Sequence, residues 1–145
     1  MDYTQYQEAY FANPQPEPRF HFCSSFGITL FYESYNQAVA FYTQVLGIPA
    51  YAEGTGTRGW QIGTGWLTLL HSKSGNPRNV EITLELATPS QAEKLQQAFI
   101  DAGGTGAPPS DQLMYVPIRS CPVVDPFGTE ILIISKLACY GGQTV

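Results

Sequence analysis

Residues 38–49 read AVAFYTQVLGIP, a stretch that predicts the end of a helix. If the chain contains such a helix twice, it consists of a duplicated unit, and this decides the fold. The apolar residues of the stretch recur at the spacing of one helix face: Ala38, Phe41, Tyr42 and Val45. Gly47 stands where a helix commonly ends in a left-handed residue, and Pro49 keeps the helix from restarting. Before the helix, Ser34 and Gln37 have the spacing of a capping box.

A second helix with the same signals follows later in the chain. Thr88 and Gln91 repeat the capping pattern, and Pro89 stands at the favoured first helical position. The apolar positions again mark one face: Ala92, Leu95, Ala98, Phe99 and Ala102. A pair of glycines, 103–104, ends the run. The two cap residues lie 54 positions apart (88 minus 34), so the sequence predicts a duplicated unit.

Strand patterns repeat at the same offset. FGITLFY (26–32) and VEITLEL (80–86) both alternate, which predicts strands with one face packed on a helix. The offset places three residues of the first strand opposite three of the second: Gly27 on Glu81, Thr29 on Thr83 and Phe31 on Glu85. Strand-like segments follow each helix, at about 50–53, 57–62 and 66–71, and at about 113–116, 118–124 and 129–135.

Each copy is therefore β-α-β-β-β, with Pro117 and the turn DPFG (125–128) breaking the second set of strands. A single copy leaves one face of its sheet uncovered. We expect an α+β fold in which two modules form one curved, mostly antiparallel sheet around a cavity, with the helices outside.

Composition narrows the class of partner. The 145 residues suit one domain, and a net charge of −5 argues against nucleic acid and favours a neutral or cationic small ligand. Cys23, Cys121 and Cys139 form no CxxC pair, which favours reduced thiols in a cytoplasmic protein. No apolar run has membrane-spanning length, and the acidic, polar start does not have the pattern of a secretory signal.

Three stretches together resemble the vicinal-oxygen-chelate superfamily, which includes glyoxalase I, extradiol dioxygenases, and the bleomycin- and fosfomycin-resistance proteins. They are AVAFYTQVLGIP, FIDAGG and RSCPVVDPFGTEILII. The resemblance covers 25–136, with modules at about 25–72 and 79–136, an N-terminal tail over 1–24 and a C-terminal tail over 137–145. It implies paired modules around a cavity, but no single reaction.

Metal-dependent members hold their metal on the first and last strands of each module. Carried over one at a time, those positions fall on Gly27, Glu81, Leu132 and, near an uncertain register, Thr68. Only Glu81 can bind a metal strongly, whereas a catalytic site generally needs three protein ligands. We therefore expect no bound metal. The alternative is a divalent metal on an unusual set, Glu81, Glu85 and His71.

The resemblance turns the polar face of each first strand toward the cavity. The ligand-binding residues that we predict are Gly27, Thr29, Phe31, Trp60, Trp66, Thr68, Glu81, Thr83, Glu85 and Arg119. For several of these residues a purely structural role is the alternative. The two glutamates can belong to a solvated face, Arg119 can form an internal salt bridge to one of them, and the aromatic residues can be core or dimer packing.

Three functions remain after this reading. The first is a metal-free small-molecule binding protein of the bleomycin-resistance type, with its ligand in the concave face of the sheet. The second is a metal-dependent lyase, isomerase or dioxygenase of the same superfamily, and the third is a non-catalytic interaction module. The low charge and many aromatic residues also predict a homodimer.

Overall fold

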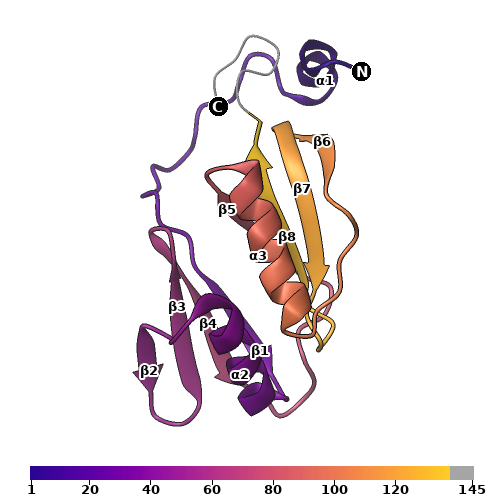
Figure 1. Ribbon diagram of the computed structural model, residues 1–145. Coiled ribbons are helices and arrows are strands. Elements are labelled where there is room, and N and C mark those ends of the chain that lie inside the picture. The colour runs from indigo at the N-terminus through magenta and orange to yellow at the C-terminus, as the bar shows by residue number, and fades with distance from the viewer. Residues whose placement is uncertain (138–145) are drawn as a thin grey trace.

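The computed structural model describes residues 1–137. After a short helix α1 (Tyr3–Tyr10), the chain forms two β-α-β-β-β modules in succession (Figure 1). The first module consists of β1 (Ile28–Tyr32), α2 (Tyr35–Leu46), β2 (Tyr51–Glu53), β3 (Thr57–Ile62) and β4 (Gly65–His71). The second consists of β5 (Glu81–Leu86), α3 (Pro89–Asp101), β6 (Ser110–Met114), β7 (Val116–Val124) and β8 (Glu130–Lys136). Apart from Leu137, the predicted C-terminal tail lies outside the described residues, as does Cys139.

The strands form two four-stranded sheets with the same topology. Sheet A has the order β1-β4-β3-β2 and sheet B the order β5-β8-β7-β6. The β1–β4 and β5–β8 pairs are parallel, and the other pairs are antiparallel. The predicted α+β fold of two modules is confirmed. The strands do not form the single continuous sheet that was predicted. β1 and β5 are edge strands of separate sheets, and no hydrogen-bonded ladder joins them.

Strand register confirms the internal repeat. Thr29 pairs with Thr68 in the first module, and Thr83, its counterpart 54 positions on (83 minus 29), pairs with Leu132 in the second. Thr68 and Leu132 are therefore equivalent positions on the last strands of the two modules, as the sequence suggested.

Each helix covers one face of its own sheet, and the two helices meet. Buried residues of the first strands, such as Leu30 and Ile82, point into a core that is continuous through both modules. Phe99 of α3 contacts Phe41 and Tyr42 of α2, with ring centroids 5.8 and 6.1 Å apart. The hydrophobic effect thus holds the modules together where backbone hydrogen bonds do not.

Most predicted boundaries hold, with two local corrections. The Thr88 side chain caps α3 by accepting from the Gln91 N–H at 3.2 Å, as predicted. Ser34 makes no such bond to α2; instead its own N–H donates to the Asn76 side chain at 3.0 Å. Strand β6 covers Ser110–Met114 rather than 113–116. The chain reverses at Tyr115, whose φ is 64°, and not at Pro117, which lies inside β7.

A buried polar network ties the turn of the second module to the first module. Asp125, of the DPFG turn, is 4% exposed, and its carboxylate accepts from the hydroxyls of Tyr32 at 2.7 Å and Tyr42 at 2.9 Å. Its other oxygen accepts from the N–H groups of Phe127 and Thr129 at 2.9 and 2.8 Å. Both tyrosines are fully buried. The turn is thus a structural joint between the modules.

This network predicts that the protein loses stability in alkali. Burial raises the pKa of Tyr32 and of Tyr42, and the Asp125 carboxylate adds to both effects. The folded state therefore holds two phenol protons that the unfolded chain releases above its ordinary tyrosine pKa of about 10. The contribution is complete below that pH and falls as the pH rises further.

Urea unfolding followed by circular dichroism across this pH range measures the loss. We expect the midpoint to fall steadily above about pH 10, and less steeply in Tyr42→Phe, which carries one such proton fewer. A midpoint that stays constant or rises in that range contradicts the expectation.

The N-terminal helix is absent from the sequence-based prediction, which placed only a tail there. Asp2 and Gln5 form a complete capping box, with the Gln5 N–H donating to Asp2 at 2.8 Å. Tyr3 and Tyr6 hold the β6–β7 turn: the Tyr3 hydroxyl donates to the Tyr115 carbonyl at 3.3 Å, and the Tyr115 N–H donates to the Tyr6 hydroxyl at 2.8 Å. Among residues 1–137, no helix has the length and apolar character that crossing a membrane requires.

Candidate functional site

The faces of the two sheets that point away from α2 and α3 are called the open face here. In sheet A the strand register sets out rows across this face, of which one reads Thr29, Thr68, Gly59, Tyr51. Alternation places the predicted residues Gly27, Phe31 and Trp66 on the same face. Phe31 is 53% exposed and Trp66 39% exposed, so large apolar surface lies uncovered there.

An aromatic pair lies over a glycine on this face. The rings of Tyr51 and Trp66 meet edge to face, 6.4 Å apart. Gly59 makes room for them, because a Cβ at that position would lie 3.3 Å from the Trp66 ring. The Tyr51 hydroxyl donates to Glu53 at 2.7 Å, and this hydrogen bond raises the pKa of Tyr51. Sequence reasoning missed Tyr51, whose only signal was its place near a glycine in a hairpin.

In sheet B the open face combines carboxylates with a packed apolar floor. The floor consists of Ile118, Leu132 and Ile134, with Met114 and Val116 against them. Glu81, Thr83 and Glu85 point to the same side of β5 and are exposed. Glu85 lies 3.9 Å from Lys136, whereas Glu81 pairs in register with a second carboxylate, Glu130.

Three cavities border the open face. The first, of about 70 Å³, lies at the seam between the sheets, with Phe26, Ile28 and Trp66 on one side and Thr83 of β5 on the other. A second, of about 340 Å³, lies between β1 and the 72–80 connection and includes Thr29 and Phe31. A third, of about 380 Å³, lies where Glu81 meets Glu130 and the loop at 105–107.

The seam cavity brings two predicted residues from different modules together. Trp66 and Thr83 both line it, although they belong to sheets that share no hydrogen-bonded ladder. Its volume is about that of two water molecules, so it can take a methyl group or a ring edge rather than a whole ligand. The rest of its lining is apolar and belongs to the core or packs against it: Ile28, Ile62, Leu67, Ile82 and Leu84. The cavity is therefore an apolar notch between the core and the open face, which part of a larger molecule could enter.

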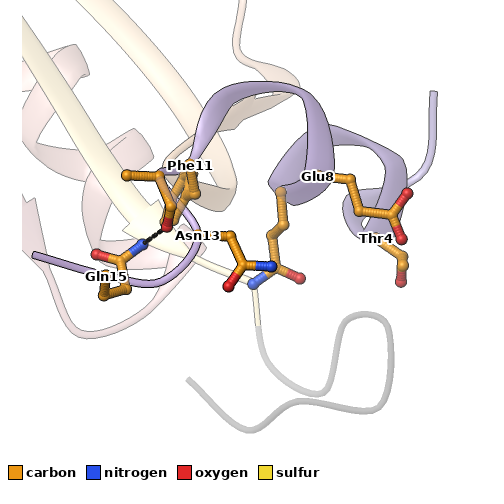
Figure 2. Close-up of a pocket in the computed structure, with 7 residues that line it drawn as sticks. Thr4, Glu8, Phe11, Asn13 and Gln15 are labelled. Carbon is orange, nitrogen blue, oxygen red and sulfur yellow. Dashed lines mark hydrogen bonds between the residues drawn. The ribbon is translucent and has the colours of Figure 1, made fainter.

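A further pocket, of about 400 Å³, lies in the N-terminal segment (Figure 2). Its lining residues all come from α1 and the turn that follows it: Thr4, Gln7, Glu8, Phe11, Ala12, Asn13 and Gln15. The Gln15 side chain donates to the Ala12 carbonyl at 2.9 Å within this turn. No predicted site residue reaches this pocket, so we do not regard it as the site.

Two predicted ligand-binding residues, Trp60 and Arg119, lie on the helix side of their sheets and not on the open face. Trp60 is 2% exposed, lies on the α2 side of β3, and donates its indole N–H to the Gly47 carbonyl at 2.8 Å. It belongs to the core because β3 points Trp60 and Ile62 toward α2, whereas Gly59 faces the open side.

Arg119 is the second such residue. It lies on the α3 side of β7 and pairs with Asp111 and, at 3.4 Å, with Glu93, rather than with Glu81 or Glu85. The hydrogen bond to Asp111 raises the pKa of Arg119. Arg119 therefore does form a salt bridge, as the alternative prediction had it, but with Asp111 and Glu93 instead of Glu81 or Glu85.

The donor atoms of the open face do not fit the metal that the superfamily often carries. Among the four inherited positions, Gly27 has no side chain and Leu132 packs in the apolar floor. His71 follows buried Leu69 on the α2 side of β4, where its ring contacts Tyr35 at 6.2 Å between centroids, so it does not join the two glutamates. Within residues 1–137, no group of three or more His, Cys, Asp or Glu could hold a metal ion.

Comparison with known proteins agrees with the fold. Residues 23–133 match the family model of the Glyoxalase/Bleomycin resistance protein/Dioxygenase superfamily. A glyoxalase/bleomycin resistance protein from Albidiferax ferrireducens T118 has a TM-score of 0.63 at 18% identity, over 76% of this chain and 97% of that one. A glyoxalase/bleomycin resistance protein/dioxygenase family enzyme from Burkholderia phytofirmans PsJN has a TM-score of 0.63 at 18% identity, over 77% of this chain and 97% of that one.

An integron cassette protein from the mobile metagenome of the Halifax Harbour Sewage Outfall has a TM-score of 0.64 at 19% identity, over 79% of this chain and 99% of that one. None of the curated proteins matches the chain. These low identities show a shared fold alone. The family model spans most of both modules, and the chain belongs to the glyoxalase/bleomycin resistance/dioxygenase superfamily.

Proposed function

We propose that the protein binds a small neutral or cationic molecule, without a metal, on the open face at the seam between the sheets. One observation carries this proposal: Trp66 of sheet A and Thr83 of sheet B line the same cavity. A ligand placed there would rest an apolar ring on Trp66 and offer a polar group to the Thr83 hydroxyl. Aromatic side chains with few polar groups are typical of small-molecule sites.

The charges on sheet B support a preference for cations. Glu81 and Glu130 are adjacent in register, and within residues 1–137 no salt bridge neutralises either of them. Two like charges on neighbouring strands disfavour each other, and a cation nearby would relieve the repulsion. The ring of Trp66 would add cation–π attraction of about 0.5–1 kcal/mol at an exposed site.

The exposed aromatic residues of the open face also support the expected homodimer. Phe31, Tyr51 and Trp66 lie on one face and are each more than a third exposed, at 53%, 47% and 39%. A second copy could cover part of this apolar surface and deepen the ligand site. We further propose a cytoplasmic location, which the absence of a CxxC pair in the sequence supports. Sedimentation at high micromolar concentration tests the dimer.

Binding of a planar aromatic cation tests the function. Proflavine titrated into the protein should quench tryptophan emission, whereas fluorescein, a planar ring system of similar size with negative charge, should bind at least tenfold more weakly. Glu81→Gln should weaken proflavine binding by about threefold to tenfold, because it removes roughly 1 kcal/mol of attraction. Lys136→Gln should strengthen it, because it frees Glu85 from its partner.

A steric variant serves as the second arm of this test. A Cβ at Gly27 would meet only the Trp66 carbonyl, at 3.6 Å, so the backbone tolerates a side chain there. Gly27→Phe should therefore keep the melting temperature near that of the wild type and abolish proflavine binding by placing a bulky ring beside the seam, between Phe26 and Ile28. If both Gly27→Phe and Glu81→Gln bind like the wild type, the open face is not the site, and an interaction module becomes the better reading. Elemental analysis of the purified protein tests the metal-dependent alternative, which requires a stoichiometric metal ion.

A further inference from the structure

The segment between α1 and β1 is fastened at both ends and free in the middle. Its first end is α1, which Tyr3 and Tyr6 hold against the β6–β7 turn of the second module. Its last end is fixed to the first module, where the Ser25 hydroxyl donates to the Thr64 carbonyl at 2.6 Å. Residues 12–23, called the strap here, run between these two points from α1 to the start of β1 (Figure 1).

The middle of the strap makes no hydrogen bond to either module within the part of the chain that the structure describes. All residues over 12–23 are exposed. Phe20 is 66% exposed and Phe22 87% exposed. Full burial of a phenylalanine side chain stabilises by about 1.5–3 kcal/mol, so two such rings in water leave a large gain unrealised.

The position of the strap allows these rings to reach the seam. Phe22 precedes Phe26 by four residues, and Phe26 lines the seam cavity with Trp66. Four residues span at most about 14 Å, so rotation about the backbone between Phe22 and the fixed Ser25 can bring the Phe22 ring over the seam. No ladder hydrogen bond has to break, because the strap belongs to no strand.

We infer that the strap closes over a bound ligand and that Phe20 and Phe22 are further ligand-binding residues. This inference rests on the proposed function, since it concerns the same seam. A planar ligand lying on Trp66 has its second face in water until an aromatic ring of the strap covers it. The ligand is then held between the ring of Trp66 in β4 and an aromatic ring of the strap.

The experiment uses the full chain and proflavine. Trypsin can cut after Arg19, in the middle of the strap, and after Lys73, in the exposed β4–β5 connection. We expect saturating proflavine to slow the cut after Arg19 at least tenfold and to leave the cut after Lys73 unchanged. The double variant Phe20→Ala/Phe22→Ala should bind proflavine about tenfold more weakly than the wild type.

Ile48→Ala is the matched control, because Ile48 is an exposed apolar residue, at 88%, that lies after α2 and outside the strap. It should bind proflavine like the wild type. If Glu81→Gln weakens binding while the double phenylalanine variant behaves like Ile48→Ala and Arg19 gains no protection, the strap inference is overturned and the proposed function stands. If the wild type binds proflavine no better than fluorescein, the proposed function fails, and the inference fails with it.

Discussion

Asp125→Ala is expected to destabilise the protein by about 3–5 kcal/mol, because it removes several hydrogen bonds to a charged group, which contribute about 1.5–3 kcal/mol each. The carboxylate accepts four hydrogen bonds, two from backbone N–H groups of its own turn and two from Tyr32 and Tyr42. Alanine leaves all four donors without this acceptor, and three of the four hydrogen bonds are buried. Since the total stability of a domain is about 5–15 kcal/mol, this loss can leave little folded protein.

Urea unfolding at neutral pH, followed by circular dichroism, measures the effect. Asp125→Asn keeps one carbonyl acceptor and should lose less stability, so it remains measurable if the alanine variant does not fold. Asp111→Ala is the control, because its carboxylate, paired with Arg119, is 58% exposed and should contribute less than about 1 kcal/mol. A loss at Asp125 no larger than that at Asp111 would show that the network does not hold the modules together.

Gly65→Ala should destabilise by about 3 kcal/mol, at the upper end of the cost of overpacking. A Cβ at Gly65 would lie 1.9 Å from the Phe26 carbonyl oxygen and 3.0 Å from its carbon. The obstacle is backbone, so no side-chain rotation relieves it. The two backbone segments also cannot easily move apart, because Ser25 is hydrogen-bonded to Thr64 and β4 is paired on both sides.

Gly27→Ala is the matched comparison for Gly65→Ala. Both glycines lie where β1 begins beside β4, but the Cβ at Gly27 would make an ordinary contact at 3.6 Å. We expect that variant to stay within about 0.5 kcal/mol of the wild type. Equal unfolding midpoints for the two alanine variants would contradict the close packing of residue 26 on Gly65.

Local signals in the sequence were strong enough to predict the modules. Helix periodicity, the Thr88 cap and the offset between the first strands depend on residues a few positions apart, and the structure retains them. The N-terminal helix escaped prediction although Asp2 and Gln5 have the spacing of a capping box. Its other support comes from contacts over long separations, since Tyr3 and Tyr6 bind Tyr115, more than a hundred positions away. The Ser34 cap failed for a similar reason, since Asn76 bonds to Ser34 instead.

The candidate site was only partly within reach of the sequence. The clean alternation of VEITLEL fixed the exposed side of Glu81, Thr83 and Glu85, because one face of that strand is wholly apolar. The β3 segment TRGWQI has no such contrast, so the sequence could not tell that Trp60 faces the core. A period of two determines which residues share a face, but the packing of the helix determines which face is buried.

The sequence by itself determined that this protein consists of two β-α-β-β-β modules of one superfamily and that few metal ligands remain at the inherited positions. Only the tertiary structure decided that Trp66 meets Thr83 at a seam, that Asp125 joins its turn to Tyr32 and Tyr42, and that Arg119 turns away from the open face. The physical reason is that hydrogen-bonding patterns and hydrophobic periods act between near neighbours, whereas these contacts depend on how two modules without a common ladder pack their helices together.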